Sequence, residues 1–428
     1  MNDSVKIGII GLGYVGLPLA ALLAREFQVM GYDRDVKRVE SLKAGIVPIS
    51  EPGLPELLQN ALSSGKLTVT SNPGELGATD VKIITVGTPY DEHLDKVDFS
   101  QLLSSLSDIK NALKFGDVVM LKSTVTPGTT EGMVKDFIES IGFKIPSEIG
   151  LAFSPERMIE GRAVKDFQEL PKIVGASDDR TYGVAKRILT SLGGTISRVS
   201  NATTAELVKM VDNYSRYVFL GLTNEIALMS EAIGVDVLEV ISAAKRDYPR
   251  NAGILLPGPG VGGSCLNKDP FILRENMQTR GLELKMVNAA KTVNRNMPSR
   301  VAEIVSRFSN GRRSILVAGL AFKGDTDDTR YSTFEEISAI LEKTGFLISY
   351  SDPYVKSPSI HNGSDIYSDL KGKDVLLLLT DHGEYKTLNL ERIKELMARN
   401  PVIVDTRGII ERREAERIGF EYHGLGRL

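Results

Sequence analysis

The hydrophobic residues of this chain fall into short apolar runs separated by longer stretches with helical periodicity. The first run covers residues 7–10; a glycine-rich turn, an apolar helical stretch over residues 17–27 and a second run over residues 28–32 follow it. Short apolar runs without polar alternation predict strands buried on both faces, as in a parallel sheet. The order strand, turn, helix, strand therefore predicts a Rossmann-like unit at the start of the chain.

The glycine-rich turn has the spacing of a dinucleotide-binding fingerprint, in which glycines permit a tight bend and a close approach to the pyrophosphate. Asp33 ends the second strand, 22 residues after Gly11. A carboxylate there accepts hydrogen bonds from the ribose 2′-OH and repels a 2′-phosphate, so we expect NAD, with Arg34 keeping NADP as the alternative. The predicted contacts are Gly11, Gly13, Tyr14, Val15, Gly16, Asp33 and Arg34.

Apolar runs at residues 81–86, 117–121 and 149–153 predict further strands of the same sheet. Ligands of parallel sheets bind at the carboxyl ends of the strands. Thr88 and Thr124 follow two of these ends and are therefore candidates to line the nicotinamide or its ribose. A threonine at such a position also serves commonly as a turn or N-cap residue, and that alternative stays open.

A long helical stretch follows and runs to Gly234 without a helix breaker. Thr203 and Glu206 have the spacing of a capping box at its start. About 30 residues at 1.5 Å each span about 45 Å, which is longer than one domain needs. Lys209 and Asn213 stand four residues apart and share one face. Most lysines are simply solvated, but the cysteine loop downstream favours a functional role for this pair.

The last third of the chain repeats the pattern of the first. Strand-like segments at residues 313–318, 347–352, 374–380 and 401–405, which parallel the strands of the first domain, predict a second parallel sheet. The predicted fold class is α/β, with two Rossmann-like, doubly wound parallel-sheet domains joined by a long central helix. Two such domains imply two nucleotide-bearing ligands.

The first turn of the second domain lacks the glycine fingerprint and carries Lys323 and Arg330 instead, so side-chain cations would meet a phosphate there. We expect residues 1–200 to form the NAD-binding domain, 201–300 a central helical region that contains the cysteine loop and mediates dimerisation, and 301–428 the second nucleotide-binding domain.

Residues 257–269 hold the only cysteine of the chain, Cys265, among glycines and prolines that fit neither helix nor strand. The two glycines before it would let a substrate approach the backbone closely. Lys268 and Asp269 follow, and neighbouring charges tune a thiolate. A structural cysteine usually packs as a small hydrophobe inside a strand or helix. The loop therefore favours a catalytic thiol, with burial as the alternative.

The composition is typical of a globular protein and gives no reason to expect a highly charged binding partner. It is 25% charged and 42% hydrophobic, with a net charge of -3 and a pI near 6.0, so nothing favours nucleic acid or an anionic membrane. No apolar run approaches the roughly 18 residues that span a bilayer. A single cysteine makes no intrachain disulfide, and no signal-type leader precedes the first strand, so we expect the cytoplasm.

Together these motifs resemble the UDP-glucose/GDP-mannose 6-dehydrogenase family over essentially the whole chain. The matching stretches are residues 11–18, 51–54, 87–89, 122–125 and 155–156, Lys209 with Asn213, residues 262–265 with Lys268 and Asp269, residues 319–323, and residues 327–330. Family members oxidise C6 of a nucleotide-linked sugar to the carboxylate with two NAD and a covalent cysteine intermediate. They are typically dimers across the central helix, and the resemblance implies a homodimer here.

The resemblance also implies roles for the matched residues. Attack by Cys265 would hold the aldehyde as a thiohemiacetal, because a free aldehyde would diffuse away, and the second oxidation would give a thioester. Asp269 and Thr124 would position a water molecule, while Lys209 with Asn213 would stabilise the oxyanion. The implied catalytic set is Cys265, Lys209, Asn213, Asp269, Thr124 and Glu156, where Glu156 serves thioester hydrolysis.

Further residues are implied as ligand contacts, and no metal ligand is assigned. The cofactor set gains Thr88, Thr124 and Lys268. The substrate set is Glu156, Arg157, Lys209, Asn213, Arg250, Gly262, Lys323, Arg330 and Arg407. Of these, Lys323 and Arg330 match positions that hold the phosphates and the sugar, and Arg250 resembles an arginine that reaches the sugar of the neighbouring subunit.

The identity of the sugar rests on a few positions. Arg157 resembles the residue found in the branch of the family that oxidises UDP-N-acetylhexosamines such as UDP-N-acetyl-D-mannosamine. Residues 159–161 and 263–265, in contrast, are more similar to those of the glucose branch. We expect a UDP-N-acetylhexosamine, with UDP-glucose as the alternative. A two-electron hydroxyacid dehydrogenase would not need Cys265, and an NAD-binding regulator would need no catalytic set. Two, one or no NADH per substrate separates these three classes.

Overall fold

The computed structural model describes residues 5–49, 51–91, 96–159, 161–356 and 365–427. The chain forms two compact units, Met1–Asp212 and Asn213–Leu428. Helix α8 (Ala202–Ile233) continues across the boundary between these units. Glu160, which belongs to the segment 159–161 compared above, lies outside the described residues.

The first unit contains an eight-stranded sheet in the order β10-β9-β8-β7-β4-β1-β2-β3. Neighbouring strands are parallel except for the antiparallel pair β8 and β9. The strands are β1 (Lys6–Ile10), β2 (Gln28–Tyr32), β3 (Leu67–Thr70), β4 (Val81–Ile84), β7 (Val118–Leu121), β8 (Gly150–Phe153), β9 (Lys172–Ala176) and β10 (Ile196–Arg198). A separate hairpin pairs β5 (Tyr90–Asp91) with β6 (Lys96–Val97).

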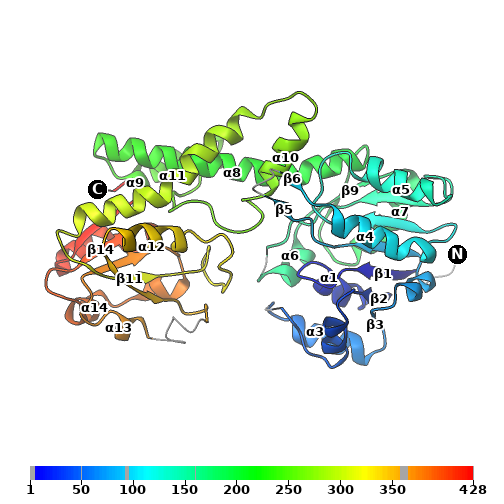
Figure 1. The fold of residues 1–428 in the computed structure, drawn as a ribbon, viewed down its shortest axis with the longest axis horizontal. Coiled ribbons are helices and arrows are strands. Elements are labelled where there is room, and N and C mark those ends of the chain that lie inside the picture. Colours follow the sequence, from blue (N-terminus) through cyan, green and yellow to red (C-terminus); the bar gives the residue numbers. More distant parts are fainter. Residues whose placement is uncertain (1–4, 50, 92–95, 160, 357–364, 428) are drawn as a thin grey trace. The chain divides into compact units, whose positions relative to one another are not determined.

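Helices cover both faces of this sheet (Figure 1). Ile7 and Ile9 of β1 pack with α1, α2, α3, α6 and α7, whereas Ile10 packs on the other face with α4 and α5. The helices are α1 (Gly16–Leu23), α2 (Val36–Lys43), α3 (Leu54–Ser63), α4 (Ser100–Ile109), α5 (Lys135–Ser140), α6 (Ala163–Glu169) and α7 (Asp179–Thr190), with short turns η1 (Pro73–Ala78), η2 (Lys110–Ala112) and η3 (Thr130–Val134). Burial on both faces explains why the strands are apolar without alternation.

The start of α8 differs from the expected capping box. Asn201, rather than Thr203, caps the helix, because its Oδ1 accepts the backbone N–H of Thr204 at 2.8 Å. Glu206 is fully buried and accepts the backbone N–H groups of Gly128 and Thr130 at 2.6 and 2.8 Å. The predicted cap was wrong because a tertiary contact uses the glutamate instead.

The second unit contains a five-stranded, wholly parallel sheet in the order β12-β11-β13-β14-β15. Its strands are β11 (Ser314–Ala318), β12 (Leu347–Ser351), β13 (Val375–Leu378), β14 (Val402–Asp405) and β15 (Glu421–Gly424). Its other elements are α9 (Val237–Lys245), η4 (Pro249–Asn251), α10 (Asp269–Gln278), α11 (Lys285–Phe308), α12 (Phe334–Lys343), α13 (Ile366–Asp369), η5 (Gly383–Thr387), α14 (Leu390–Leu396) and α15 (Arg412–Ile418). Residues of α11 and α12 pack on one face, and residues of α13, α14 and α15 on the other.

These elements confirm the predicted fold class: two doubly wound, largely parallel sheets and one long helix. The cysteine loop lies between η4 and α10 and forms turns and bends, as its glycines and prolines predicted. Within the described parts of the chain, none of the helices combines the length and the apolar character needed to cross a membrane.

Candidate active site

The fingerprint turn follows β1 and is shaped by three glycines with different tasks. Gly11 has φ 93°, which favours glycine. A Cβ on Gly16 would lie 1.9 Å from the carbonyl oxygen of Gly11, so this glycine allows α1 to approach the turn. A Cβ on Gly13 would meet no described atom within 4 Å, which leaves its backbone open to a ligand. The turn therefore fits a pyrophosphate at the start of α1.

Asp33 ends β2 beside this turn. Its Oδ2 accepts the backbone N–H of Leu12 at 2.8 Å and lies 3.1 Å from Nη1 of Arg38. Arg34 lies beside Asp108, with Nε 2.9 Å from Oδ2 and Nη2 3.0 Å from Oδ1. In the sequence, Arg34 kept NADP open as an alternative cofactor. Its guanidinium forms a bidentate pair with Asp108 instead.

The two predicted threonines lie at the carboxyl ends of β4 and β7. Thr88 is buried, and its hydroxyl donates to the carbonyl oxygen of Thr124, so it supports the loop that carries Thr124. Ser123 donates to the carbonyl oxygen of Val86 at 2.6 Å and ties the same two strand ends together. Thr124 is half-buried. Contacts of Thr88 and Thr124 with NAD stay predictions.

Glu156 follows β8 and is held by a buried cation. Its Oε2 lies 3.2 Å from Nζ of Lys122, whose side chain is 1% exposed, and its Oε1 accepts the backbone N–H groups of Arg157 and Met158 at 2.9 and 3.0 Å. Burial, followed by the positive charge of Lys122, lowers the pKa of the neighbouring Lys172 to about 8. Sequence reasoning gave Lys122 no role, although a lysine that ends an apolar strand is rarely buried unless it is paired.

Arg157 makes its contacts inside the first unit. Its Nη1 lies 3.4 Å from Oδ2 of Asp212, and its Nη2 donates to the carbonyl oxygen of Pro171. Asp212 and Lys209 both belong to the part of α8 that lies in this unit, and Lys209 is half-buried. The expected substrate contacts of Arg157 and Lys209 stay predictions.

In the second unit, three predicted catalytic residues are connected. Asn213 donates from Nδ2 to Oδ2 of Asp269 at 2.6 Å, and both side chains are buried. The backbone N–H of Asp269, the first residue of α10, donates to the carbonyl oxygen of Cys265 at 2.9 Å. Nζ of Lys268 lies 4.0 Å from Oδ1 of Asp269. Cys265 is exposed, so the loop presents its thiol to solvent.

The two glycines before Cys265 pack closely against Phe322. A Cβ on Gly262 would lie 2.5 Å from Cβ of Phe322, and one on Gly263 would lie 2.8 Å from Cε2 of the same ring. The packing of Phe322 is thus one reason for glycine at both positions, and the expectation that they let a substrate approach the backbone stays a prediction. A backbone contact of Gly262 with substrate stays a prediction.

The cations expected to hold the substrate surround this loop. Gly263 donates its N–H to the carbonyl oxygen of Arg330 at 3.1 Å. Arg407 donates from Nε to the carbonyl oxygen of Leu379 at 2.8 Å, and its Nη1 would lie 2.7 Å from a Cβ on Gly258. Nζ of Lys323 lies 5.7 Å from the centre of the Phe322 ring. Arg250, in contrast, is exposed on η4.

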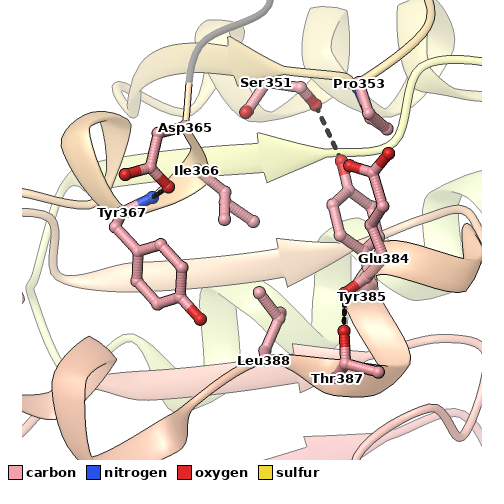
Figure 2. Close-up of a pocket in the computed structure, with 9 residues that line it drawn as sticks. All are labelled: Ser351, Pro353, Asp365, Ile366, Tyr367, Glu384, Tyr385, Thr387 and Leu388. Carbon is pink, nitrogen blue, oxygen red and sulfur yellow. Dashed lines mark hydrogen bonds between the residues drawn. The ribbon is translucent and has the colours of Figure 1, made fainter.

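A separate cavity of about 440 Å³ lies in the second unit between the end of β12 and η5 (Figure 2). It contains none of the predicted site residues. Its lining consists of Ser351, Pro353, Asp365, Ile366, Tyr367, Glu384, Tyr385, Thr387 and Leu388.

Three family models match the chain. They describe the NAD binding domain (residues 5–192), the central domain (203–296) and the UDP binding domain (316–412) of the UDP-glucose/GDP-mannose dehydrogenase family. The chain is 34% identical to a UDP-N-acetyl-D-mannosamine dehydrogenase of Methanococcus aeolicus, over 98% of this chain and 95% of that protein.

Two solved structures are similar over nearly their whole length. A UDP-D-ManNAc dehydrogenase from Pyrococcus horikoshii has a TM-score of 0.88 at 33% identity, with 99% of each chain covered. A UDP-glucose dehydrogenase from Pyrobaculum islandicum has a TM-score of 0.86 at 29% identity, with 99% of this chain and 98% of that one covered. The resemblance and the cofactor inferred from sequence are confirmed: this chain belongs to the UDP-glucose/GDP-mannose dehydrogenase family and is an NAD-dependent nucleotide-sugar dehydrogenase.

Proposed function

We propose that the chain oxidises the C6 alcohol of a UDP-N-acetylhexosamine, UDP-N-acetylmannosamine in the first place, to the carboxylate in two steps through a covalent intermediate on Cys265. The observation that carries this proposal is the exposed thiol of Cys265 on a loop anchored by Asp269 and packed against Phe322. The curated relative from Methanococcus aeolicus, named for UDP-N-acetyl-D-mannosamine, supports the choice of sugar.

The chemistry requires two hydride transfers, and bound NAD supplies the hydride acceptor in each. In the first oxidation the C6 hydroxyl gives up a proton and C6 a hydride, which leaves an aldehyde. The thiolate of Cys265 then adds to the aldehyde carbon, and the resulting thiohemiacetal gives up the second proton and hydride to become a thioester. Water attacks the thioester carbon, the carboxylate forms and the thiolate leaves. Two NADH per sugar balance the four electrons.

The remaining roles follow the anchors described above. The amide of Asn213, fixed on Asp269, and the ammonium of Lys209 would stabilise the oxyanion, and Asp269 with Thr124 would position the water that accepts a proton. Glu156, held by Lys122, would serve hydrolysis of the thioester. Lys323, Arg330 and Arg407 would meet the diphosphate and the sugar, and Arg157, Gly262 and Arg250 are the further proposed substrate contacts.

We propose further that the enzyme is a homodimer whose subunits pair along α8. Exposed apolar side chains at positions 207, 211, 222, 229 and 233 fall on one stripe of this helix. At 3.6 residues per turn, Lys209 and Asn213 fall on the opposite side. Pairing along the stripe would leave the catalytic side of the helix uncovered. The division into a NAD-binding, a central and a substrate-binding part, 1–200, 201–300 and 301–428, belongs to the same proposal.

One assay tests the activity and the sugar together. NADH is counted to completion with UDP-N-acetylmannosamine, UDP-N-acetylglucosamine, UDP-glucose and GDP-mannose in parallel. We expect two NADH per UDP-N-acetylmannosamine and the highest kcat/KM for that sugar. One NADH per sugar would contradict the cysteine mechanism. A higher kcat/KM with UDP-glucose would reject the N-acetylhexosamine assignment and leave the mechanism intact.

A further inference from the structure

A fully buried histidine, His382, connects three strand ends of the second unit. It follows β13, and its Nε2 lies 3.1 Å from Oδ2 of Asp352, which follows β12. Its Nδ1 accepts the backbone N–H of Asp325 at 3.0 Å. Asp325 lies two residues after Lys323 in the turn that follows β11. The imidazole therefore bridges a buried carboxylate and the backbone of the lysine-bearing turn.

These contacts fix the tautomer of the ring. Because Nδ1 accepts an N–H group, the neutral imidazole carries its proton on Nε2 and donates it to Asp352. Burial alone raises the pKa of Asp352, but hydrogen bonds from His382 and from the backbone N–H groups of Leu320, Val355 and Tyr354 outweigh burial and lower it to about 2. Asp352 thus stays ionised and keeps the acceptor nitrogen of His382 directed at the turn.

Two further hydrogen bonds join this turn to the segment that follows β13. Oδ1 of Asp325 accepts the backbone N–H of Gly383 at 2.8 Å, and the N–H of Gly324 donates to Oδ1 of Asp381 at 3.2 Å. Asp325 has φ 58°, a left-handed conformation that is uncommon for residues other than glycine, although aspartate and asparagine adopt it more readily than most. The hydrogen bond to His382 is one of the contacts that hold this conformation.

Two aromatic rings hold the plane of the imidazole. Tyr354 stacks on it at 5.1 Å between ring centres, and Tyr385 meets it edge-on at 5.3 Å. The hydroxyl of Tyr385 donates to the carbonyl oxygen of Ser351 at 3.2 Å, as Figure 2 shows in the wall of the cavity. The ring is therefore fixed in position as well as in tautomer.

We propose that His382 is a positioning residue for the nucleotide sugar: by accepting the backbone N–H of Asp325, it holds the turn in which Lys323 meets the diphosphate. The inference rests on the substrate contact of Lys323 proposed above. A phosphate contact made by one flexible lysine depends on where its backbone is held, because the turn offers no fingerprint glycines to bind phosphate in its place.

Two substitutions separate the two contacts of the ring. His382→Gln places an amide nitrogen near Nε2, so it can still donate to Asp352 but no longer accepts from Asp325. His382→Asn places an amide oxygen near Nδ1 and keeps that acceptor. Calorimetric titration with UDP measures the effect independently of the sugar. We expect His382→Gln to raise the Kd of UDP about fivefold to tenfold, His382→Asn to raise it less, and neither to change the Kd of NAD.

Lys323→Met provides the reference for a double-mutant cycle. It should raise the Kd of UDP by itself, and in its background His382→Gln should add less than about twofold, because the group that it misplaces is gone. An equal effect of His382→Gln in both backgrounds, or an equal loss of NAD affinity, overturns the positioning role. If Lys323→Met alone leaves the Kd unchanged, the proposed substrate contact of Lys323 fails, and this inference fails with it.

A second pair of variants reaches the turn from the surface and decides the question if His382→Gln does not fold. Asp325 is exposed. Asp325→Gly tolerates the left-handed backbone but removes the acceptor for Gly383, whereas Asp325→Asn keeps an acceptor oxygen and also tolerates this conformation. We expect the Kd of UDP to be higher in the glycine variant than in the asparagine variant. Equal values in both overturn the proposal that bonds to the segment after β13 position the turn.

Discussion

Replacing Gly262 by alanine should disturb the cysteine loop without touching the thiol. The added Cβ would lie 2.5 Å from Cβ of Phe322 and 3.2 Å from the carbonyl oxygen of Tyr331. The first contact is shorter than real Cβ contacts, and a Cβ cannot rotate away as the end of a side chain can. Overpacking of this kind costs about 1–3 kcal/mol.

Either the loop or the turn that carries Phe322 must therefore move. Gly263, the next residue, donates its N–H to Arg330, so a shift of the loop also moves the backbone that leads to Cys265. We expect the free energy of unfolding of Gly262→Ala to fall by about 1–3 kcal/mol, and kcat for NADH formation to fall about tenfold or more, because small misplacements of reacting groups are expensive. Urea titration followed by fluorescence and steady-state kinetics measure the two effects.

Gly183→Ala is the matched control, because this glycine lies in α7 and its Cβ would meet no described atom within 4 Å. There the substitution should stabilise the helix by about 0.5–1 kcal/mol and leave kcat unchanged. If Gly262→Ala is as stable and as active as the wild type, the packing of Phe322 on the loop does not explain its glycines, and the reasoning above is refuted.

Four further predictions concern other parts of the molecule. Cys265→Ser should lose steady-state turnover but keep its affinity for UDP and NAD, because an alkoxide is a poor leaving group. Intact-protein mass spectrometry should find a covalent ester or bound aldehyde. Two NADH per sugar at the wild-type rate would leave the thiol without a catalytic role. Asp33→Asn should raise the KM of NAD about tenfold or more, because a charged acceptor for the ribose is lost. It should also improve the relative use of NADP, because the charge that repels the 2′-phosphate is lost. An unchanged ratio of kcat/KM for the two cofactors would contradict this. Asp352 has a folded pKa of about 2, below the unfolded value of about 3.9, so its contribution of roughly 2–3 kcal/mol is fully present above about pH 4 and is lost as the pH falls toward 2. In acid titrations Asp352→Asn should be less stable than the wild type at pH 6 and approach it only near pH 2, and a constant difference would refute the linkage. Leu222→Glu should convert the dimer into a monomer by light scattering, because it places a charge in the apolar stripe of α8; an unchanged mass would reject pairing along that stripe.

The fold was predictable because its strands are buried on both faces. Runs such as residues 7–10 and 402–404 contain no polar side chain, and glycines follow strands such as these, so both sheets follow from local pattern. The capping of α8 was not predictable in this way, because Glu206 has the correct spacing for a capping box and its actual partners, Gly128 and Thr130, lie more than 70 residues earlier.

Candidate site residues could be chosen from the sequence where the proposed chemistry depends on residue type, but the residues that support them could not. Cys265 stands out in the sequence because it is a lone thiol next to glycines. Asp269 adds a carboxylate to the same loop, and Asn213 adds an amide to one face of the long helix. Lys122 and His382 do not, because each acts through a long-range partner: Glu156 in one case and the backbone of Asp325 in the other. The spacing of residues along the sequence does not predict such long-range contacts.

The two sheets show how one device serves two purposes. In both, an aspartate after the second strand accepts the backbone N–H of the residue after the first glycine: Asp33 takes that of Leu12 at 2.8 Å, and Asp352 that of Leu320 at 2.6 Å. Asp33 is 9% exposed beside an open glycine turn, so it keeps room for a ribose. Asp352 is 1% exposed and binds His382, so it has none.

This difference argues against a second dinucleotide site at the second sheet. Asp352 is committed to the backbone of the turn and to His382, so this carboxylate is not left to accept the hydroxyls of a ribose. With the proposed contacts, recognition there would depend on side-chain cations, whose positions are set by the turn that carries them. A buried neutral histidine is suited to hold such a turn, because it supplies an acceptor for the backbone without adding a positive charge beside the lysine.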